Sequence, residues 1–520
     1  MSYIKDRITA RYYATLKQSI YANNPPYPYN VIVYTEGGHY YAKDEGGNLI
    51  CVDSPTACIQ EAALSAKGGG RVLIKRGVYT VSQTIDLGSG DLNLTIEGED
   101  MWSTTVAPAS DIPVFKAVAG SANYVKNLSL RQLRIFGNGA GTGLVLGASQ
   151  QNVLQFAALI EVEKVFFDSL KQSIYANNLW ISRLVDVISN GGVSGGPPAI
   201  QLDQNGADTS HDVYIVRLYS EGNGSRPLSL PPHSYDIVVR DSYIDARVDY
   251  LIYMDPSSHD NAVFGSYLVD ATSYAIYASP TSRIEGNSIL NSANGIYSTG
   301  AIVRGNALAS ISGYGIYLVN PSTYLNIVEG NAVQGAQIGI YSAADNAMIR
   351  GNRIYNTSAQ AIWVYYHTGN LIEGNSIYQA QTSGGQGIIE IEGQYNVVKG
   401  NFVNSSKGAY AVLEGDGDYN TIVDNALLAP AAVKWVGAHT YVDNNVAYIK
   451  RNAGQATIAS GSTSVAVSHG LSCTPSKVLV TPLAQPSGSI WVSGITSSQF
   501  TINISTAPSS NLPIAWYAEC

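Results

Sequence analysis

The stretch Arg283–Ile289 reads RIEGNSI, and seven related stretches follow it before residue 450. They read AIVRGNAL, NIVEGNAV, MIRGNRI, LIEGNSI, VVKGNFV, TIVDNAL and YVDNNVA. Their Gly-Asn or Asp-Asn pairs begin at residues 286, 305, 330, 351, 374, 400, 424 and 443, in steps of 19 to 26 residues. A second short apolar strand follows many of the pairs, such as GIY at 295, 315 and 339. Each step therefore holds short alternating strands that are separated by Gly and Asn turns.

This repeat predicts an all-β fold, a right-handed parallel β-helix, over roughly residues 70–446. One coil cannot bury its own apolar face, so coils stack and share columns of Ile, Val and Leu side chains. Gly and Asn suit the corners, because Gly adopts a left-handed backbone and stacked amides can bond along the axis. The missing Leu spacing excludes a leucine-rich repeat, and the short period excludes a propeller.

The same pattern extends upstream of the first Gly-Asn pair. The segment 162–178, VEKVFFDSLKQSIYANN, aligns without a gap with residues 284–300. Its last nine residues, LKQSIYANN, recur at Leu16–Asn24, inside the N-terminal segment ITARYYATLKQSIYANN at residues 8–24. This N-terminal arm therefore resembles a detached copy of an internal coil.

Three interpretations of the arm stay open: a first coil of the same subunit, a relic of duplication, or a coil donated to a second copy of the chain. A donated coil would satisfy the unpaired backbone groups at the end of a β-helix. Such assembly predicts a homo-oligomer or filament, with PPYPYN at residues 25–30 as an extended tether. The side chains expected to mediate it are Ile8, Tyr12, Tyr13, Leu16, Ile20 and Tyr21.

Composition and charge narrow the function classes. Charged residues are 13% of the 520, while Gly and Tyr number 51 and 36, which suits strands joined by tight turns. A net charge of -9 argues against a nucleic acid partner, because phosphate contacts need a basic patch. No apolar run is long enough for a membrane-spanning helix, and MSYIKDRITARYY at the start lacks the apolar centre of a signal peptide. We expect an extracellular or virion-surface protein that needs no cofactor.

Four cysteines fall into two local pairs, Cys51 with Cys58 and Cys473 with Cys520. As two disulfides they would indicate an oxidising compartment, whereas a cytosolic protein would keep them as free thiols. The sequence alone leaves both states open.

Residues 53–108 include DSPTACIQEAALSAKGGGRVLIKRGVYTVSQTIDL. This segment resembles the first part of pectate-lyase-like β-helix proteins, a family that includes phage tailspikes. The resemblance implies a capping helix over Thr56–Ala66 and extends to about Val446. One departure is Lys75, where the family commonly has Pro.

After Arg451 the spacing predicts about six antiparallel strands in a small β-sandwich. This part looks like the terminal modules of viral tail fibres and of β-helix proteins from thermophiles and their viruses. The expected organisation is an N-terminal arm (1–52), the β-helix (53–450) and the C-terminal β-sandwich (451–520).

Catalytic motifs of related polysaccharide-degrading enzymes are absent. The best candidates are Asp212, Asp236 and Asp260, which recur in two steps of 24 residues. Stacked coils would bring neighbours to about 5 Å, the spacing of a retaining glycosidase, and close like charges raise one pKa. The competing interpretation is structural, because later coils place Asn326, Asn346, Asn370, Asn396 and Asn420 near the same corner.

No metal site is expected. His211 and His259 would lie two coils apart, too far to share an ion. The run Asp416-x-Asp418-x-Asn420 lacks the rest of a calcium loop.

Tyr277, Tyr297, Tyr317 and Tyr341 recur at one position of the coil. They would stack as an outer ladder, which suits glycan binding, or pack into a subunit contact. Two functions therefore compete. The first is a structural or adhesive surface protein, such as a virion fibre, spike or filament subunit that self-assembles through its terminal segments. The alternative is a tailspike-like protein that binds or depolymerises polysaccharide.

Overall fold

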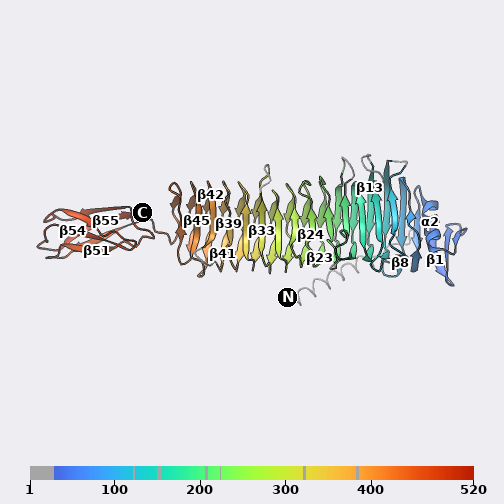
Figure 1. Ribbon diagram of the computed structural model, residues 1–520, viewed down its shortest axis with the longest axis horizontal. Coiled ribbons are helices and arrows are strands. Elements are labelled where there is room, and N and C mark those ends of the chain that lie inside the picture. Colours follow the sequence, from blue (N-terminus) through green and yellow to red (C-terminus); the bar gives the residue numbers. More distant parts are fainter. Residues whose placement is uncertain are drawn as a thin grey trace. The chain divides into compact units, whose positions relative to one another are not determined.

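The structure is a computed structural model that describes residues 29–120, 123–148, 155–204, 209–222, 224–319, 324–381 and 386–520. The chain divides into two compact units, residues 1–344 and 345–520. Both units contain coils of short parallel strands, and the second also contains two small antiparallel sheets (Figure 1).

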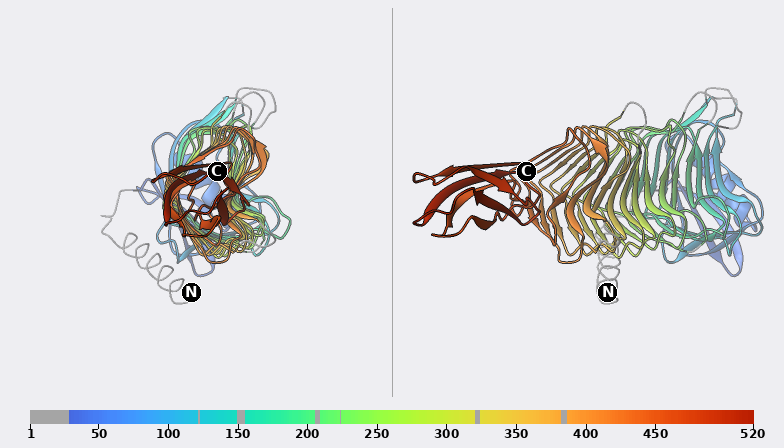
Figure 2. Two further views of the ribbon diagram at one scale, coloured as in Figure 1. Left: turned by 90° about the vertical axis from the view of Figure 1, so that its left-hand side faces the viewer. Right: turned by 60° about the vertical axis from the view of Figure 1, so that its left-hand side comes forward.

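One coil of the first unit shows the plan of all of them. Strands β28 (Arg283–Glu285), β29 (Ser288–Leu290) and β30 (Asn294–Ser298) each belong to a different sheet, which we call A, B and C. Each strand pairs in parallel with its counterpart in the next coil. Figure 2 shows successive coils of residues 31–344 lying side by side in this way. The predicted right-handed parallel β-helix is confirmed.

The three sheets are present in both units. In the first, sheet A extends from β4 (Arg71–Ile74) to β34 (Ile327–Glu329), sheet B from β5 (Gly77–Val81) to β35 (Ala332–Gln334) and sheet C from β6 (Ile85–Asp86) to β36 (Ile338–Ala343). In the second, sheet A extends from β37 (Met348–Arg350) to β49 (Tyr441–Asp443), sheet B from β38 (Arg353–Tyr355) to β47 (Ala426–Leu428) and sheet C from β39 (Ile362–Val364) to β48 (Val433–Lys434).

Columns of aliphatic side chains fill the interior of the coils. In sheet C of the first unit, Ile276, Ile296, Ile316 and Ile340 stand in register and are 0% exposed. Burying each such side chain contributes about 1.5–3 kcal/mol. Because strand residues alternate between faces, the neighbours of these residues point outward.

Asparagine ladders run along the corners between sheets A and B. In the second unit, Asn375 Oδ1 accepts from the backbone N and the Nδ2 of Asn352, at 2.9 and 3.0 Å. Its own Nδ2 donates to Ile349 O and Asn401 Oδ1, both at 2.9 Å. The preceding Gly374 has φ 63°, a left-handed backbone that glycine adopts without strain. The Gly-Asn pair thus combines a tight corner with a hydrogen bond to the next coil.

The last pair of the repeat lies one residue beyond its predicted position. Asp443 ends strand β49, and the left-handed corner (φ 51°) falls on Asn444. Asn445 then continues the ladder by accepting from Asn425. The assignment of the pair to Asp443-Asn444 is therefore wrong, because the sequence DNN offers two overlapping pairs and only the register of β49 decides between them.

The N-terminal end of the coils is covered by helix α2 (Pro55–Ala66) and by the antiparallel strands β1 (Val31–Glu36), β2 (His39–Asp44) and β3 (Leu49–Val52). Ser54 caps the helix by accepting from Ala57 N. The predicted capping helix is present, one residue longer at its start.

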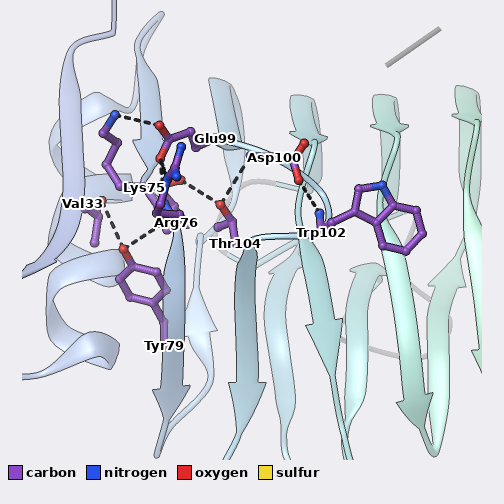
Figure 3. Close-up of polar contacts among 9 residues, drawn as sticks. Val33, Lys75, Arg76, Tyr79, Glu99, Asp100, Trp102 and Thr104 are labelled. Atoms are coloured by element: carbon purple, nitrogen blue, oxygen red, sulfur yellow. Dashed lines mark hydrogen bonds and ion pairs between the residues drawn. The ribbon is translucent and has the colours of Figure 1, made fainter. Parts of the chain in front are cut away.

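Lys75 has an ionic partner where related proteins have Pro. Its Nζ lies 3.0 Å from Glu99 Oε1, and Arg76 N donates to Glu99 Oε2 at 2.9 Å (Figure 3). Burial opposes the ionisation of Glu99, but these bonds outweigh it and lower the pKa of the carboxyl. Tyr79, which is 0% exposed, donates its hydroxyl to Lys75 O at 2.9 Å. The turn is therefore tied to the next coil by polar contacts.

The C-terminal part has two three-stranded antiparallel sheets. One comprises β50 (Arg451–Ile458), β55 (Leu512–Glu519) and β52 (Lys477–Pro482), and the other β51 (Ser464–Ser468), β54 (Gln499–Ile504) and β53 (Ile490–Ser493). Ile514 and Ala518 of the first sheet share one buried cluster with Phe500 and Ile502 of the second. The sheets therefore pack face to face, as six predicted strands require.

Both cysteine pairs form disulfides. Cys51 of β3 is bonded to Cys58 of α2 with a Cα–Cα distance of 5.0 Å, and Cys473 is bonded to Cys520 with 5.9 Å. Both distances lie within the range of ordinary disulfides.

Replacing Asn375 by Ala tests the contribution of the ladder. The change leaves several buried donors and acceptors without a partner, so we expect a loss of about 2–4 kcal/mol in unfolding free energy. Thermal and urea unfolding measure it. The control is Asn404→Ala, because Asn404 is an exposed strand residue. Equal stability of the two variants would contradict a stabilising ladder.

Candidate functional site

The outer face of sheet C in the first unit carries a column of tyrosines. Tyr253, Tyr277, Tyr297, Tyr317 and Tyr341 stand in register on β24 (Tyr250–Met254), β27 (Tyr274–Ala278), β30, β33 (Tyr314–Val319) and β36. Successive ring centroids lie 5.2, 4.5, 5.3 and 4.8 Å apart. The four tyrosines that recur in the sequence therefore form one continuous ring stack with Tyr253.

A second set of tyrosines borders this column. Tyr250, Tyr274 and Tyr314 lie at the start of their sheet C strands, three residues before a column tyrosine. Tyr274 meets Tyr297 edge-on at 5.2 Å, and Tyr314 meets Tyr317 at 5.0 Å. We call the eight residues together the tyrosine band. All of these residues except Tyr341 are half-buried, and the stacked rings of the column face one another, which leaves their edges toward solvent.

Burial helps to keep four tyrosines of the band uncharged. It is the main cause that raises the pKa of Tyr274, Tyr277, Tyr297 and Tyr317 above the ordinary phenol value, and neighbouring tyrosines raise the pKa of Tyr274 further. The hydroxyls therefore stay protonated well above neutral pH. A protonated phenol can both donate and accept a hydrogen bond.

In the second unit, sheet C carries a pair of glutamates on its outer face. Glu390 and Glu392 alternate with the inward Ile389 and Ile391 on β42 (Gly387–Gln394). A point one Cβ bond above Gly415 lies 3.6 Å from Glu390 Oε1 and 3.5 Å from Glu392 Oε1. Gly415 is exposed and has no side chain, so none covers the two carboxylates at this position.

The two carboxyl groups lie in different environments. Burial raises the pKa of Glu392, and the charges of Glu390 and Asp416 raise it further. Glu390 is only 7% exposed and accepts from Gln360 Nε2 at 2.9 Å. Acid–base cleavage of a glycosidic bond uses two carboxyl groups, and the raised pKa of Glu392 is the direction that a general acid needs. The ring of Trp363 adjoins this site, because it is paired in register with Glu390.

The three aspartates that the sequence suggested as catalytic lie at one left-handed corner. Asp212, Asp236 and Asp260 have φ 53, 53 and 55°. His211 Nδ1 lies 2.9 Å from Asp212 Oδ2, and His259 Nδ1 lies 2.9 Å from Asp260 Oδ2. All three aspartates therefore form the corner itself, and Asp212 and Asp260 each bond to the preceding histidine.

The ionisation of Asp260 argues for that structural interpretation. Burial opposes its ionisation, but hydrogen bonds from Thr281 and His259 outweigh burial and lower the pKa. A general acid needs the opposite shift. The catalytic assignment of the aspartates stays a prediction without support from this geometry.

The asparagines expected at the same corner do not share its position, with one exception. Asn346 has the left-handed backbone (φ 56°). Asn370, Asn396 and Asn420 follow the corner residue instead and bond along the axis, as Asn370 N does to Asn396 Oδ1 at 2.9 Å. These asparagines therefore lie near the corner, as predicted, but one residue after the left-handed position that the aspartates occupy.

The predicted assembly residues lie outside the part of the chain that the structure describes. This applies to Ile8, Tyr12, Tyr13, Leu16, Ile20 and Tyr21. The coil that they copy is described: Phe167 and Ile174 are fully buried, and Leu170 is 1% exposed.

Comparison with known proteins supports the fold more than any activity. The model of a family described as periplasmic copper-binding protein (NosD) matches residues 255–445. This match covers less than half of the chain and agrees with its right-handed parallel β-helix structure. A search of curated proteins found no match.

Three solved structures similar to this chain are as follows. A tailspike protein of E. coli bacteriophage HK620, in complex with a pentasaccharide, is 14% identical over 92% of each chain, with a TM-score of 0.48. ORF18 of Geobacillus virus E2 is 12% identical over 89% of this chain and 72% of that one, with a TM-score of 0.36. The A-module of the Azotobacter vinelandii mannuronan C-5 epimerase AlgE6 is 17% identical over 76% and 95%, with a TM-score of 0.29. At these identities the likeness concerns the fold alone.

The copper binding in the family description does not fit the residues seen here. Across the described ranges, no three or more His, Cys, Asp or Glu side chains lie together as a metal site. His259, His367 and His439 fall within the matched residues, and each is bound to an aspartate instead. Tyr235 stacks between His211 and His259, which keeps these two imidazoles apart.

The glutamate pair was missed from the sequence. Its signal is the alternation in IIEIEG at residues 388–393, followed one coil later by LEGDG at 413–417. Alternation places both glutamates on the outer face, but a register shift between Ile391 and Glu392 decides their neighbours in the next coil. Sequence spacing does not reveal such a shift.

Proposed function

We propose that this protein is a structural, adhesive surface protein, such as a virion fibre, spike or extracellular filament subunit, that binds carbohydrate polymers along the tyrosine band. The observation that supports this proposal is the in-register stack from Tyr253 to Tyr341. Aromatic rings offer flat apolar surface, and tyrosine adds a polar edge that bonds hydroxyl groups.

The repeat of the band matches a polymeric ligand. Coils recur about every 4.8 Å, so one chain laid along the stack would contact several rings at once. Each contact is weak, but linked contacts gain from effective concentration. The proposed ligand is therefore a long chain and not a single sugar.

An extracellular or virion location is part of the proposal. Two disulfides favour an oxidising environment. Within the described ranges, no helix has the length and apolar character needed to cross a bilayer.

A second candidate function is polysaccharide cleavage, and the glutamate pair is the observation that favours it. Glu392, with its raised pKa, would protonate the leaving oxygen. Glu390, whose Oε1 lies close to that of Glu392 beside Gly415, would act as base or nucleophile. Trp363 would provide a face for a sugar ring.

Self-assembly is a separate element of the proposal and rests on the sequence of the arm. Residues 16–24 repeat residues 170–178, so the arm carries the same apolar side chains as the buried coil. Strand β49 is the last strand of sheet A in the described chain and pairs there with β46 (Thr421–Val423) on one side. Its other side offers backbone groups to an added strand.

Replacing Tyr277 and Tyr297 together by Ala tests the adhesive function. Loss of two aromatic contacts, at about 0.5–1.5 kcal/mol each, predicts roughly 5–150-fold weaker binding. Calorimetry and affinity electrophoresis with dextran, mannan, alginate and polygalacturonate provide the measurement. Tyr214→Ala is the control, because Tyr214 is an exposed tyrosine on sheet A. Equal binding by both variants would refute a role of the band.

Glu392→Gln tests the cleavage function against the same four polymers. Loss of the general acid predicts a fall in the rate of release of reducing ends of about 100-fold or more. Asp236→Asn is the control and should keep both rate and melting temperature. If the rate of release of reducing ends falls in Asp236→Asn instead, at an unchanged melting temperature, the aspartates and not the glutamates would be the catalytic residues.

Deletion of residues 1–24 tests self-assembly. If the arm is donated, light scattering and electron microscopy should show dispersed, folded monomers in place of the particles formed by the full chain. Particles of unchanged size would remove the donated-coil proposal.

A further inference from the structure

The turns between sheets B and C line a trough beside the tyrosine band. It consists of two hollows of about 470 Å³ each. Arg247 and Thr272 line both hollows, so the two adjoin. The first hollow begins at Ser194 and the second ends at Ser312. The trough therefore follows the direction in which the coils stack.

The trough crosses six successive B–C turns. At about 4.8 Å per coil, the five steps between them span roughly 24 Å. Tyr250 and Tyr274 directly follow turns that line it, after Asp249 and Ser273. A chain lying in the trough would thus run alongside the border of the tyrosine band.

The charges of the trough cancel. Arg226 and Asp249 form an ion pair, with Arg226 Nε 3.0 Å from both carboxylate oxygens. The other charged residues that line the trough are Arg247 and Asp270, one of each sign. A polyanion would meet two aspartates, and a polycation would meet two arginines. A lining without net charge offers no net attraction to offset the hydration that either polymer would lose.

Arg226 is held in place as well as neutralised. Its guanidinium carbon lies 4.9 Å from the ring centroids of both Tyr250 and Tyr253. A guanidinium fixed by a carboxylate and two rings keeps its direction, and its Nε and Nη2 already donate to Asp249. This residue joins the trough to the tyrosine band.

The rest of the lining is uncharged and combines polar side chains with small or apolar ones such as Val248 and Ala293. Thr272, Asn291, Ser292 and Ser310 contribute hydroxyl and amide groups. Ser225, which is 7% exposed, lines the first hollow, and its Oγ has no hydrogen-bond partner in the described structure. Such a lining suits a ligand with many hydroxyl groups and no charge.

We infer that the trough binds an uncharged polysaccharide, which lies along the coil stack with its ring faces toward Tyr250 and Tyr274 and its hydroxyl groups toward Arg226, Asp249 and Thr272. This inference rests on the proposed carbohydrate binding and adds the class of polymer and the place of its polar contacts. The tyrosine band supplies stacking, and the trough selects against charge.

Thr272→Trp tests the inference, because Thr272 is exposed and lines both hollows. Calorimetry with dextran and mannan, against alginate and polygalacturonate, measures binding to the full-length protein. The wild type is expected to bind at least one uncharged polymer and neither uronate polymer. Filling the trough should weaken that binding tenfold or more. Ser312→Trp, at the far end, is a second exposed variant with the same expectation.

Gln334→Trp is the control, because Gln334 is an exposed residue of β35 on sheet B. It should bind as the wild type does. If the trough variants bind normally while the tyrosine variants do not, the trough is excluded and the proposed function stands. Preferred binding of the uronate polymers would overturn the inference on charge. Failure of the wild type to bind any polymer would overturn both.

Discussion

Parallel, in-register hydrogen bonding between coils is the constraint on which the rest of this structure depends. A residue at a given position of one coil lies directly beside its counterpart in the next, about 4.8 Å away. Any residue type that repeats with the coil therefore becomes a column. Isoleucine becomes a core column, asparagine becomes a hydrogen-bonded ladder, and tyrosine becomes a stack of rings. Variation in loop length does not disturb the columns, because the pairing of the strands resets the register in each coil.

Much of the fold could be predicted from the sequence because two requirements meet at one dipeptide. The corner needs a left-handed backbone, which glycine adopts freely, and the next residue needs a side chain that both donates and accepts. Few dipeptides other than Gly-Asn meet both requirements, so the repeat can be recognised directly in the sequence. The exception at residues 443–445 shows the limit: where several Asp and Asn residues adjoin, the choice between them depends on strand pairing.

The candidate sites were harder to predict, for different reasons. The aspartates at 212, 236 and 260 recur every 24 residues, which suggested a catalytic role. The recurrence instead reflects the corner that they form. The glutamate pair occurs on a single strand and owes its raised Glu392 pKa to burial and to charges on neighbouring residues. A register shift within β42 sets that environment, and no spacing rule reveals it. The trough is a property of successive turns, whose lining residues have no common pattern.

The proposed carbohydrate binding is a consequence of the register of the coils. Rings and turns repeat at the same interval, so a polymer can contact both along one direction. A crystal structure with a bound oligosaccharide of dextran or mannan tests this most directly. The account predicts sugar rings facing tyrosines of the band between Tyr250 and Tyr317, with the chain parallel to the direction of coil stacking. Sugar bound at another face, or lying across the coils, would contradict it.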